Sequence, residues 1–175
     1  MTFARFYAKA LDRTLDATAV LAGLCLVFQV VSITVDVSLR YFFGAPIKAV
    51  ISLNEWSLLY IAFLAAGWLQ RESGHVRVDI VLNLLGRRGS LVADLFGVAL
   101  GIAACLVITW FGVKVTAEKL TSGVYDFFKL EDVPIWPVYL AIPVGTFLWL
   151  LQLLREAVQI VRAHGRERAD PVTDL

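Results

Sequence analysis

The sequence is poor in the residues that hold redox cofactors. It contains two histidines, His75 and His164, and both lie outside its long apolar runs. A haem held between two membrane helices needs axial ligands inside those helices, so a haem of this kind is excluded. The two cysteines, Cys25 and Cys105, form no CxxC pair, and each falls in the middle of an apolar run. Both are therefore expected to be small packing residues, and a thiol-redox enzyme is not predicted.

The acidic residues around His75 are too few to build a metal site. Glu72, His75 and Asp79 would share one side of the segment if it were helical. One Glu-x-x-His pair supplies fewer ligands than a metal ion needs, and Gly74 disfavours a helix at this point. We therefore predict no catalytic, cofactor-binding or metal-binding residue, and the chain is not expected to be an enzyme.

Apolar residues, by contrast, are abundant. Hydrophobic residues make up 59% of the 175 positions and the mean hydropathy is +0.74, which exceeds what a soluble domain of this size can bury. Four apolar runs each approach the roughly 20 residues that a helix needs to cross a bilayer. We predict an all-α integral membrane protein with one membrane domain over residues 1–175 and four spans, at about 15–39, 49–70, 91–115 and 135–155.

The segments outside the spans are short. Apolar residues recur at helical spacing before the first span, which predicts an interfacial N-terminal segment. Residues 75–86 are predicted to form an amphipathic helix on the membrane surface, which ends at the GRRG sequence of Gly86 to Gly89. Residues 156–175 are expected to form a short polar tail. Asp36 and Asp94, close to span ends, are expected to be interfacial.

The basic residues predict the orientation. Of the 16 lysines and arginines, eleven lie before the first span, between the second and third, or after the fourth, and five lie on the opposite side. By the positive-inside rule, both termini are then cytoplasmic. The formal net charge of +1 indicates no particular partner, and no nucleic acid is expected to bind.

Small residues recur every four positions along the third predicted span. They are Ala93, Gly97, Gly101 and Cys105. Such a stripe lets another helix approach closely in lipid. We expect it to pack inside the four-helix unit, and contact with another subunit is the alternative.

Two charged residues flank the first loop between spans. The second span must begin near Ala49 to be long enough, which places Glu55 inside the outer part of the membrane, where an unpaired charge is costly. Arg40 closes the first span and is a candidate partner for Glu55. In the alternative arrangement, Arg40 reaches lipid headgroups and Glu55 pairs with a different polypeptide.

Three stretches of the chain are similar to one known family: LRYFFGAPI, NEWSLLYIAFLAAGWLQRESGHVRVDIVLNLL and IPVGTFLW. With these stretches and its four-span layout, the chain resembles, over about residues 15–155, the small, Q-type (DctQ-like) membrane subunit of tripartite ATP-independent periplasmic (TRAP) transporters. The matching positions are Arg40, Tyr41, Glu55, Gly67, Arg71, His75, Val76 and Asp79.

The resemblance implies a non-catalytic subunit without cofactors in a bacterial or archaeal cytoplasmic (inner) membrane. Its implied partners are a large multispan M-type permease subunit, a periplasmic substrate-binding protein and membrane lipids, and the implied process is sodium-coupled uptake of small organic anions. Arg40 and Glu55 are the expected outer assembly positions, with Tyr41 and Gly67 as further interface candidates. Arg71, His75 and Asp79 are expected to anchor the inner surface helix.

Two other classes of function remain open. A self-sufficient homo-oligomeric channel or exporter needs polar residues at successive turns of one span. A membrane anchor subunit of an electron-transfer complex needs cofactor ligands inside the membrane. The sequence shows neither pattern.

Overall fold

Four long α-helices make up the protein in a computed structural model, which describes residues 2–73, 79–122 and 133–169. They are α1 (Thr2–Phe43), α2 (Lys48–Ser73), α3 (Asp79–Thr121) and α4 (Trp136–Ala169). Each contains a segment long and apolar enough to cross a membrane: Tyr7–Phe43, Ala49–Glu72, Val92–Thr121 and Trp136–Arg162. The predicted helical fold with four membrane-spanning segments is confirmed.

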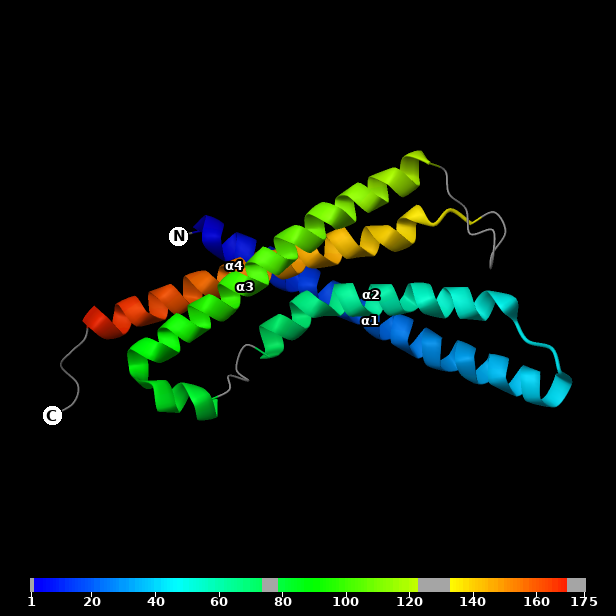
Figure 1. The fold of residues 1–175 in the computed structure, drawn as a ribbon, viewed down its shortest axis with the longest axis horizontal. Helices are drawn as coiled ribbons and strands as arrows, with labels where there is room; N and C mark the ends of the chain where they lie inside the picture. Colours follow the sequence, from blue (N-terminus) through cyan, green and yellow to red (C-terminus); the bar gives the residue numbers. More distant parts are fainter. Residues whose placement is uncertain (1, 74–78, 123–132, 170–175) are drawn as a thin grey trace.

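The four helices form an open row and not a closed bundle. α1 packs along α2, α2 packs along α4, and α4 packs along α3, so that the order in space is α1, α2, α4, α3. Among the described residues, α1 touches α4 over a small area, and α3 packs against α4 alone. Figure 1 shows the α1–α2 pair and the α3–α4 pair crossing and then spreading apart toward the α1–α2 turn.

The row of helices has two ends. The N/C end contains Asp12, Arg71 and Arg155, and the hairpin end contains Arg40 and the turn from α1 to α2. α1 ends at Phe43 because Gly44 takes the left-handed conformation, with φ of 64°, and donates its N–H to the carbonyl of Arg40 at 3.2 Å. This is the αL arrangement that commonly closes helices.

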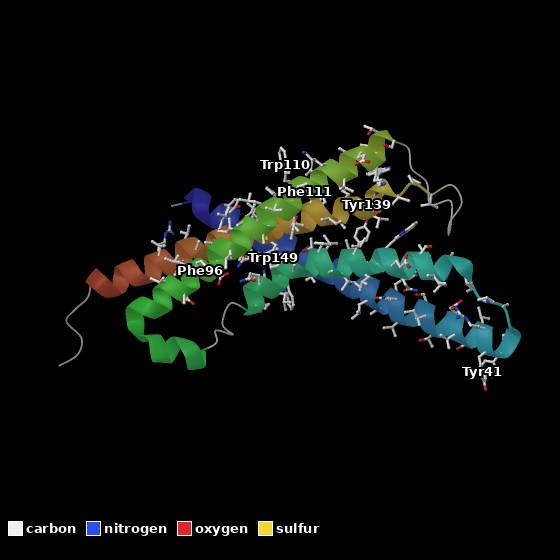
Figure 2. The ribbon with its side chains drawn as sticks, in the orientation of Figure 1. Tyr41, Phe96, Trp110, Phe111, Tyr139 and Trp149 are labelled. Carbon is white, nitrogen blue, oxygen red and sulfur yellow. The ribbon has the colours of Figure 1, made fainter. Side chains whose placement is uncertain are left out.

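Apolar side chains divide between a thin core and a broad outer surface. A buried cluster lies between α3 and α4 and consists of Val98, Cys105, Leu150, Leu153 and Ile160. The large side chains of Phe96, Trp110 and Phe111 instead lie on the outside of α3, 59–65% exposed (Figure 2). Lipid tails are as apolar as these side chains, so such a surface is stable in a bilayer.

The start of α3 differs from the prediction. The surface helix was expected to end at Gly86 to Gly89, but α3 continues through these residues from Asp79 to Thr121. A glycine inside a helix costs only about 1 kcal/mol, so two glycines do not stop a helix whose later turns are strongly apolar. The early part of α3 does turn away from the direction of the rest (Figure 1). Residues 75–78 of the predicted surface helix lie outside the described residues.

The end of α4 also differs. Residues 156–169 were predicted to be tail, yet α4 includes them as far as Ala169. This stretch is rich in Arg, Glu and Ala, which favour helix. Ile160 and Ala157 also pack on the α3–α4 core, so tertiary contact stabilises the extension.

Candidate functional site

Arg71 is the centre of an ion-pair cluster that joins helices at the N/C end. Its guanidinium donates to the carboxylate of Asp16 at 2.5 Å and to the main-chain carbonyl of Asp12 at 3.3 Å, both on α1. Glu72 lies 3.2 Å from the same guanidinium. Arg155 of α4 donates to the carboxylate of Asp12 at 2.5 Å. Asp12 therefore links α1 to α4, while Arg71 links α2 to α1.

A second set of polar bonds joins α2 to α4 at the same level. The Gln70 amide nitrogen donates to the Glu156 carboxylate at 2.9 Å, and its amide oxygen accepts the Trp149 indole N–H at 3.4 Å. Together with the Arg71 cluster, these bonds hold α1, α2 and α4 in register. The Arg71 and Arg155 side chains are only 21% and 27% exposed, so their ion pairs are less screened by water than pairs on an open surface.

Gly67 lies inside the chain's own packing. A Cβ at this position would be 2.8 Å from the Leu15 side chain and 3.3 Å from the main-chain nitrogen of Trp149. The absence of a side chain thus lets α1, α2 and α4 meet at one level. The sequence had suggested Gly67 as an interface position, and the contacts seen here are within the chain.

Gly145 brings the backbones of α2 and α4 together farther toward the hairpin end. A Cβ there would overlap the carbonyl oxygen of Phe63 and would lie 2.5 Å from its carbonyl carbon. At the hairpin-end limit of this contact, the Tyr60 hydroxyl donates to the Pro137 carbonyl at 2.7 Å. The α2 and α4 backbones therefore approach closely at two successive turns, at Gly145 and at Gly67.

Asp36 organises the turn at the hairpin end. It is 5% exposed, and its carboxylate accepts the main-chain N–H of Ile47 at 2.7 Å and the guanidinium of Arg40 at 2.8 Å. The turn folds back over Asp36 and covers its side chain, so the carboxylate is held by the chain itself. Arg40 thus forms an ion pair with Asp36 within α1, and its predicted partner Glu55 lies at an exposed position of α2.

Near this turn, a polar contact joins α1 to α2, and the aromatic side chains at the end of α1 are exposed. The Ser32 hydroxyl donates to the side-chain oxygen of Asn54 at 3.1 Å. Tyr41 is 83% exposed at the end of α1, and its ring meets Phe42 edge to face at 5.2 Å (Figure 2). Arg40, Tyr41 and Glu55 are thus all exposed among the predicted outer assembly positions.

The small-residue stripe of α3 divides into two parts. Cys105 is 1% exposed in the α3–α4 core, and a Cβ at Gly101 would lie 3.2 Å from the Leu153 side chain. Ala93 and Gly97 are exposed, and a Cβ at Gly97 would meet nothing within 4 Å. Gly101 and Cys105 therefore pack against α4, whereas Ala93 and Gly97 are left open on the outside of the chain.

The α3–α4 contact continues toward the hairpin end through polar and close-packed residues. The hydroxyl oxygens of Thr109 and Thr146 are 2.9 Å apart. A Cβ at Gly112 would lie 3.2 Å from the Pro143 ring, so glycine allows the proline of α4 to pack directly on α3.

The remaining predicted positions lie outside the described part. His75 is one of them, and although Asp79 begins α3, its side chain is not among those described. Within the described residues, no three His, Cys, Asp or Glu side chains are grouped so as to hold a metal ion.

Sequence reasoning did not select Asp12, Asp16 and Arg155. The sequence nonetheless contains a pattern that points to them, because Asp12 and Asp16 lie four residues apart and therefore on the same side of α1. Two carboxylates at the start of a membrane span require basic partners. Arg71 and Arg155, at the matching ends of α2 and α4, supply them.

These features define a class of protein. Four apolar helices, joined by polar contacts and exposing apolar faces, form a multi-pass membrane protein. A search of curated proteins gives no match. The model of the family described as "Tripartite ATP-independent periplasmic transporters, DctQ component" matches residues 29–163. The chain belongs to this family, as its sequence motifs predicted, and is a small permease subunit of the TRAP type.

Proposed function

We propose that the chain is the non-catalytic scaffold of a TRAP-type secondary transporter. It holds a large multispan M-type permease subunit in the inner membrane during sodium-coupled uptake of small organic anions. A periplasmic binding protein delivers these anions to the pair. Membership of the DctQ component family supports this division of labour.

The open row of helices is the observation that carries the proposal. α1 and α3 lie at the two edges of the row and turn broad apolar faces outward. The intramembrane contacts of Ser32 with Asn54 and of Thr109 with Thr146 join neighbouring helices to each other. A transporter's own binding site instead places polar groups around a midplane cavity. A row of connected helices with exposed apolar faces at its two edges suits a subunit against which a larger membrane protein packs.

The two ends of the row then receive different roles. With both termini cytoplasmic, the Arg71 cluster lies at the cytoplasmic boundary, where it fixes the spacing of α1, α2 and α4. His75 and Asp79 follow it in sequence and anchor the segment that leads into α3. Tyr41 and Glu55 face the periplasm, where they contact the large subunit or the binding protein.

Affinity purification in mild detergent tests the assembly. The tagged chain, co-expressed with the large subunit, is expected to recover that subunit in a defined complex. Proteoliposomes containing the complex are expected to take up an organic acid only with a sodium gradient and the binding protein. Recovery of a homo-oligomer alone, with ion conductance in liposomes, would overturn the proposal.

A matched pair of variants tests the proposed contact of Glu55 on the periplasmic side. Glu55→Gln removes a charge at the hairpin end of α2 and is expected to lower uptake or complex recovery. Glu118→Gln removes an exposed charge near the end of α3 and is the control. Equal behaviour of the two variants would remove Glu55 from the assembly surface.

A further inference from the structure

The part of α4 that lies around and beyond Arg155 has three different sides. The first side packs on α3 and consists of Leu153, Ala157 and Ile160. The second side is apolar and about half exposed, and it consists of Leu154, Val158 and Val161. The third side is polar and consists of Arg155, Gln159 and Arg162, of which the last two are exposed. Because residues at spacings of four and three share one side of a helix, the uncovered part of α4 is amphipathic.

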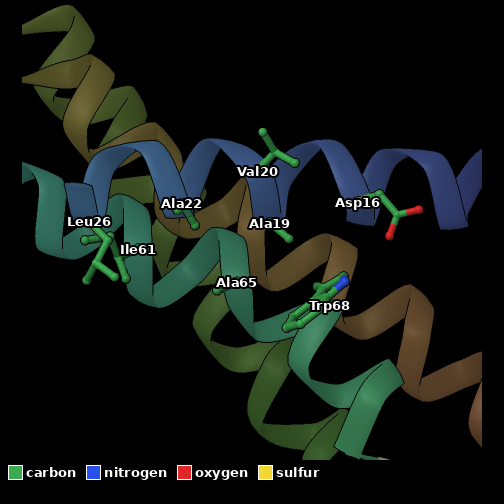
Figure 3. A pocket seen from close by; sticks show the side chains of 9 residues that line it. Asp16, Ala19, Val20, Ala22, Leu26, Ile61, Ala65 and Trp68 are labelled. Carbon is green, nitrogen blue, oxygen red and sulfur yellow. The ribbon is translucent and has the colours of Figure 1, made fainter. Parts of the chain in front are cut away.

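The ion-pair cluster marks the level at which α1 and α2 leave the hydrocarbon. Asp16 and the Trp68 indole line the same end of a pocket of about 450 Å³ between these two helices (Figure 3). Tryptophan is enriched at membrane–water interfaces, and a carboxylate is costly deeper in the membrane. Arg155 of α4 is bonded to Asp12 at this end of the row, so α4 passes the same level near Arg155.

The apolar side of α4 continues past this level. Val161 lies six residues after Arg155, which is about 9 Å along the helix axis. A headgroup layer is only about 5–8 Å thick, so an α4 perpendicular to the membrane would carry Val161 into water. Figure 1 shows the α3–α4 pair crossing the α1–α2 pair at an angle. An inclined pair keeps Val158 and Val161 close to the acyl chains.

We propose that this part of α4 binds the cytoplasmic leaflet of the membrane, with Val158 and Val161 against acyl chains and Arg162 on the phosphate of an anionic phospholipid. Helices with arginine on the polar side and apolar residues on the other lie in the interface in this way. In sequence, residues 157–169 contain three arginines and one glutamate, which complements the negative surface of that leaflet. The contact goes beyond the proposed function, because it needs no other subunit.

The other occupants of this surface fit less well. In water, Val158 and Val161 would keep 48% and 58% of their surface without an apolar neighbour. A second copy related by a two-fold axis along the membrane normal would bring the basic sides of both helices to one interface at equal depth. Acyl chains and anionic headgroups match both the apolar and the basic side.

Spin labels at two neighbouring positions test the contact. The label is placed at Val158 or at Gln159 of the full chain, with Cys25 and Cys105 replaced by alanine, in vesicles of phosphatidylcholine and phosphatidylglycerol. Collisions with oxygen, which concentrates among acyl chains, and with a water-soluble nickel complex are compared. The oxygen-to-nickel ratio is expected to be several-fold higher at Val158 than at Gln159. Equal ratios would overturn the proposal, because they would place this part of α4 entirely in water or entirely in hydrocarbon. Loss of oxygen contact at Val158 on addition of the large subunit would assign this side to that protein and would also overturn it.

Arg162→Gln tests the lipid charge. Replacing part of the phosphatidylcholine by phosphatidylglycerol is expected to raise the oxygen-to-nickel ratio at Val158, because an anionic surface attracts the basic side of the helix. Arg162→Gln is expected to reduce this rise and, because Arg162 is exposed, to leave the fold unchanged. Lys114→Gln removes an exposed positive charge toward the hairpin end of α3 and should leave the rise unchanged. A full rise in Arg162→Gln, or no rise in the unsubstituted chain, would overturn the anionic headgroup contact.

Discussion

A single methyl group at Gly145 probes the closest contact in the row. In Gly145→Ala, the new Cβ would lie 2.5 Å from the carbonyl carbon of Phe63 and 2.8 Å from its Cβ. The first distance is about 1 Å shorter than an ordinary carbon–carbon contact. The carbonyl group belongs to the main chain of α2, and the Cβ is bonded directly to that main chain, so neither can rotate away. The variant must therefore push α2 and α4 apart.

Two opposing terms determine the size of the effect. Overpacking costs about 1–3 kcal/mol, and a rigid main-chain neighbour places Gly145→Ala toward the upper part of that range. Replacing glycine by alanine in a helix returns up to about 1 kcal/mol. Gly97→Ala isolates this second term, because its Cβ meets nothing within 4 Å. We expect Gly145→Ala to be less stable than Gly97→Ala by about 1–3 kcal/mol.

Reversible unfolding in mixed micelles measures this difference. Helix content is followed while a denaturing detergent is added, and the free energies of unfolding of the two variants are compared. If Gly145→Ala is as stable as Gly97→Ala, the α2 and α4 backbones do not approach each other at Phe63 and the arrangement of the row is wrong.

Three further perturbations address the polar contacts. Arg71→Met is expected to lower the free energy of unfolding by about 1 kcal/mol, because it removes ion pairs to carboxylates that stay partly exposed to water. Arg162→Met, at an exposed position of α4, should change it by less than about 0.5 kcal/mol in the same titration. Asp36→Ala should cost about 1–3 kcal/mol, and Asp36→Asn less, since an amide oxygen still accepts the turn N–H; equal losses would contradict the role of the carboxylate in the turn. A double-mutant cycle of Thr109→Val and Thr146→Val should give a coupling of about 0.6 kcal/mol, and zero coupling would show that the hydroxyls are not bonded.

The spans and the family were predictable because each depends on a long stretch of sequence. About 20 consecutive apolar residues identify a membrane helix regardless of its neighbours. Asp36 shows where this reasoning stops. An aspartate near a span end looks interfacial in sequence, and only the return of the chain to Ile47 buries it and supplies a donor.

Glycine positions illustrate the same limit. The stripe on the third span predicts a face that allows close approach, but periodicity does not say which helix approaches. In the structure, Gly101 faces Leu153 while Gly97 faces away from the chain. The GRRG sequence was predicted to end a helix, yet the cost of its glycines is small beside the cooperativity of a long apolar helix. Arg71 was predicted as a site position, but its partners depend on the crossing of α1 and α2.

The position of α4 in the row has a consequence for how the protein is made. α4 lies between α2 and α3, and α3 packs on no other helix among the described residues. The ribosome delivers α1, α2 and α3 to the membrane before α4. Until Trp136 and the residues after it have been inserted, the nascent chain consists of one helical hairpin and one separate helix. Assembly of the four helices therefore waits for α4, and a chain truncated before α4 would leave α3 without its partner.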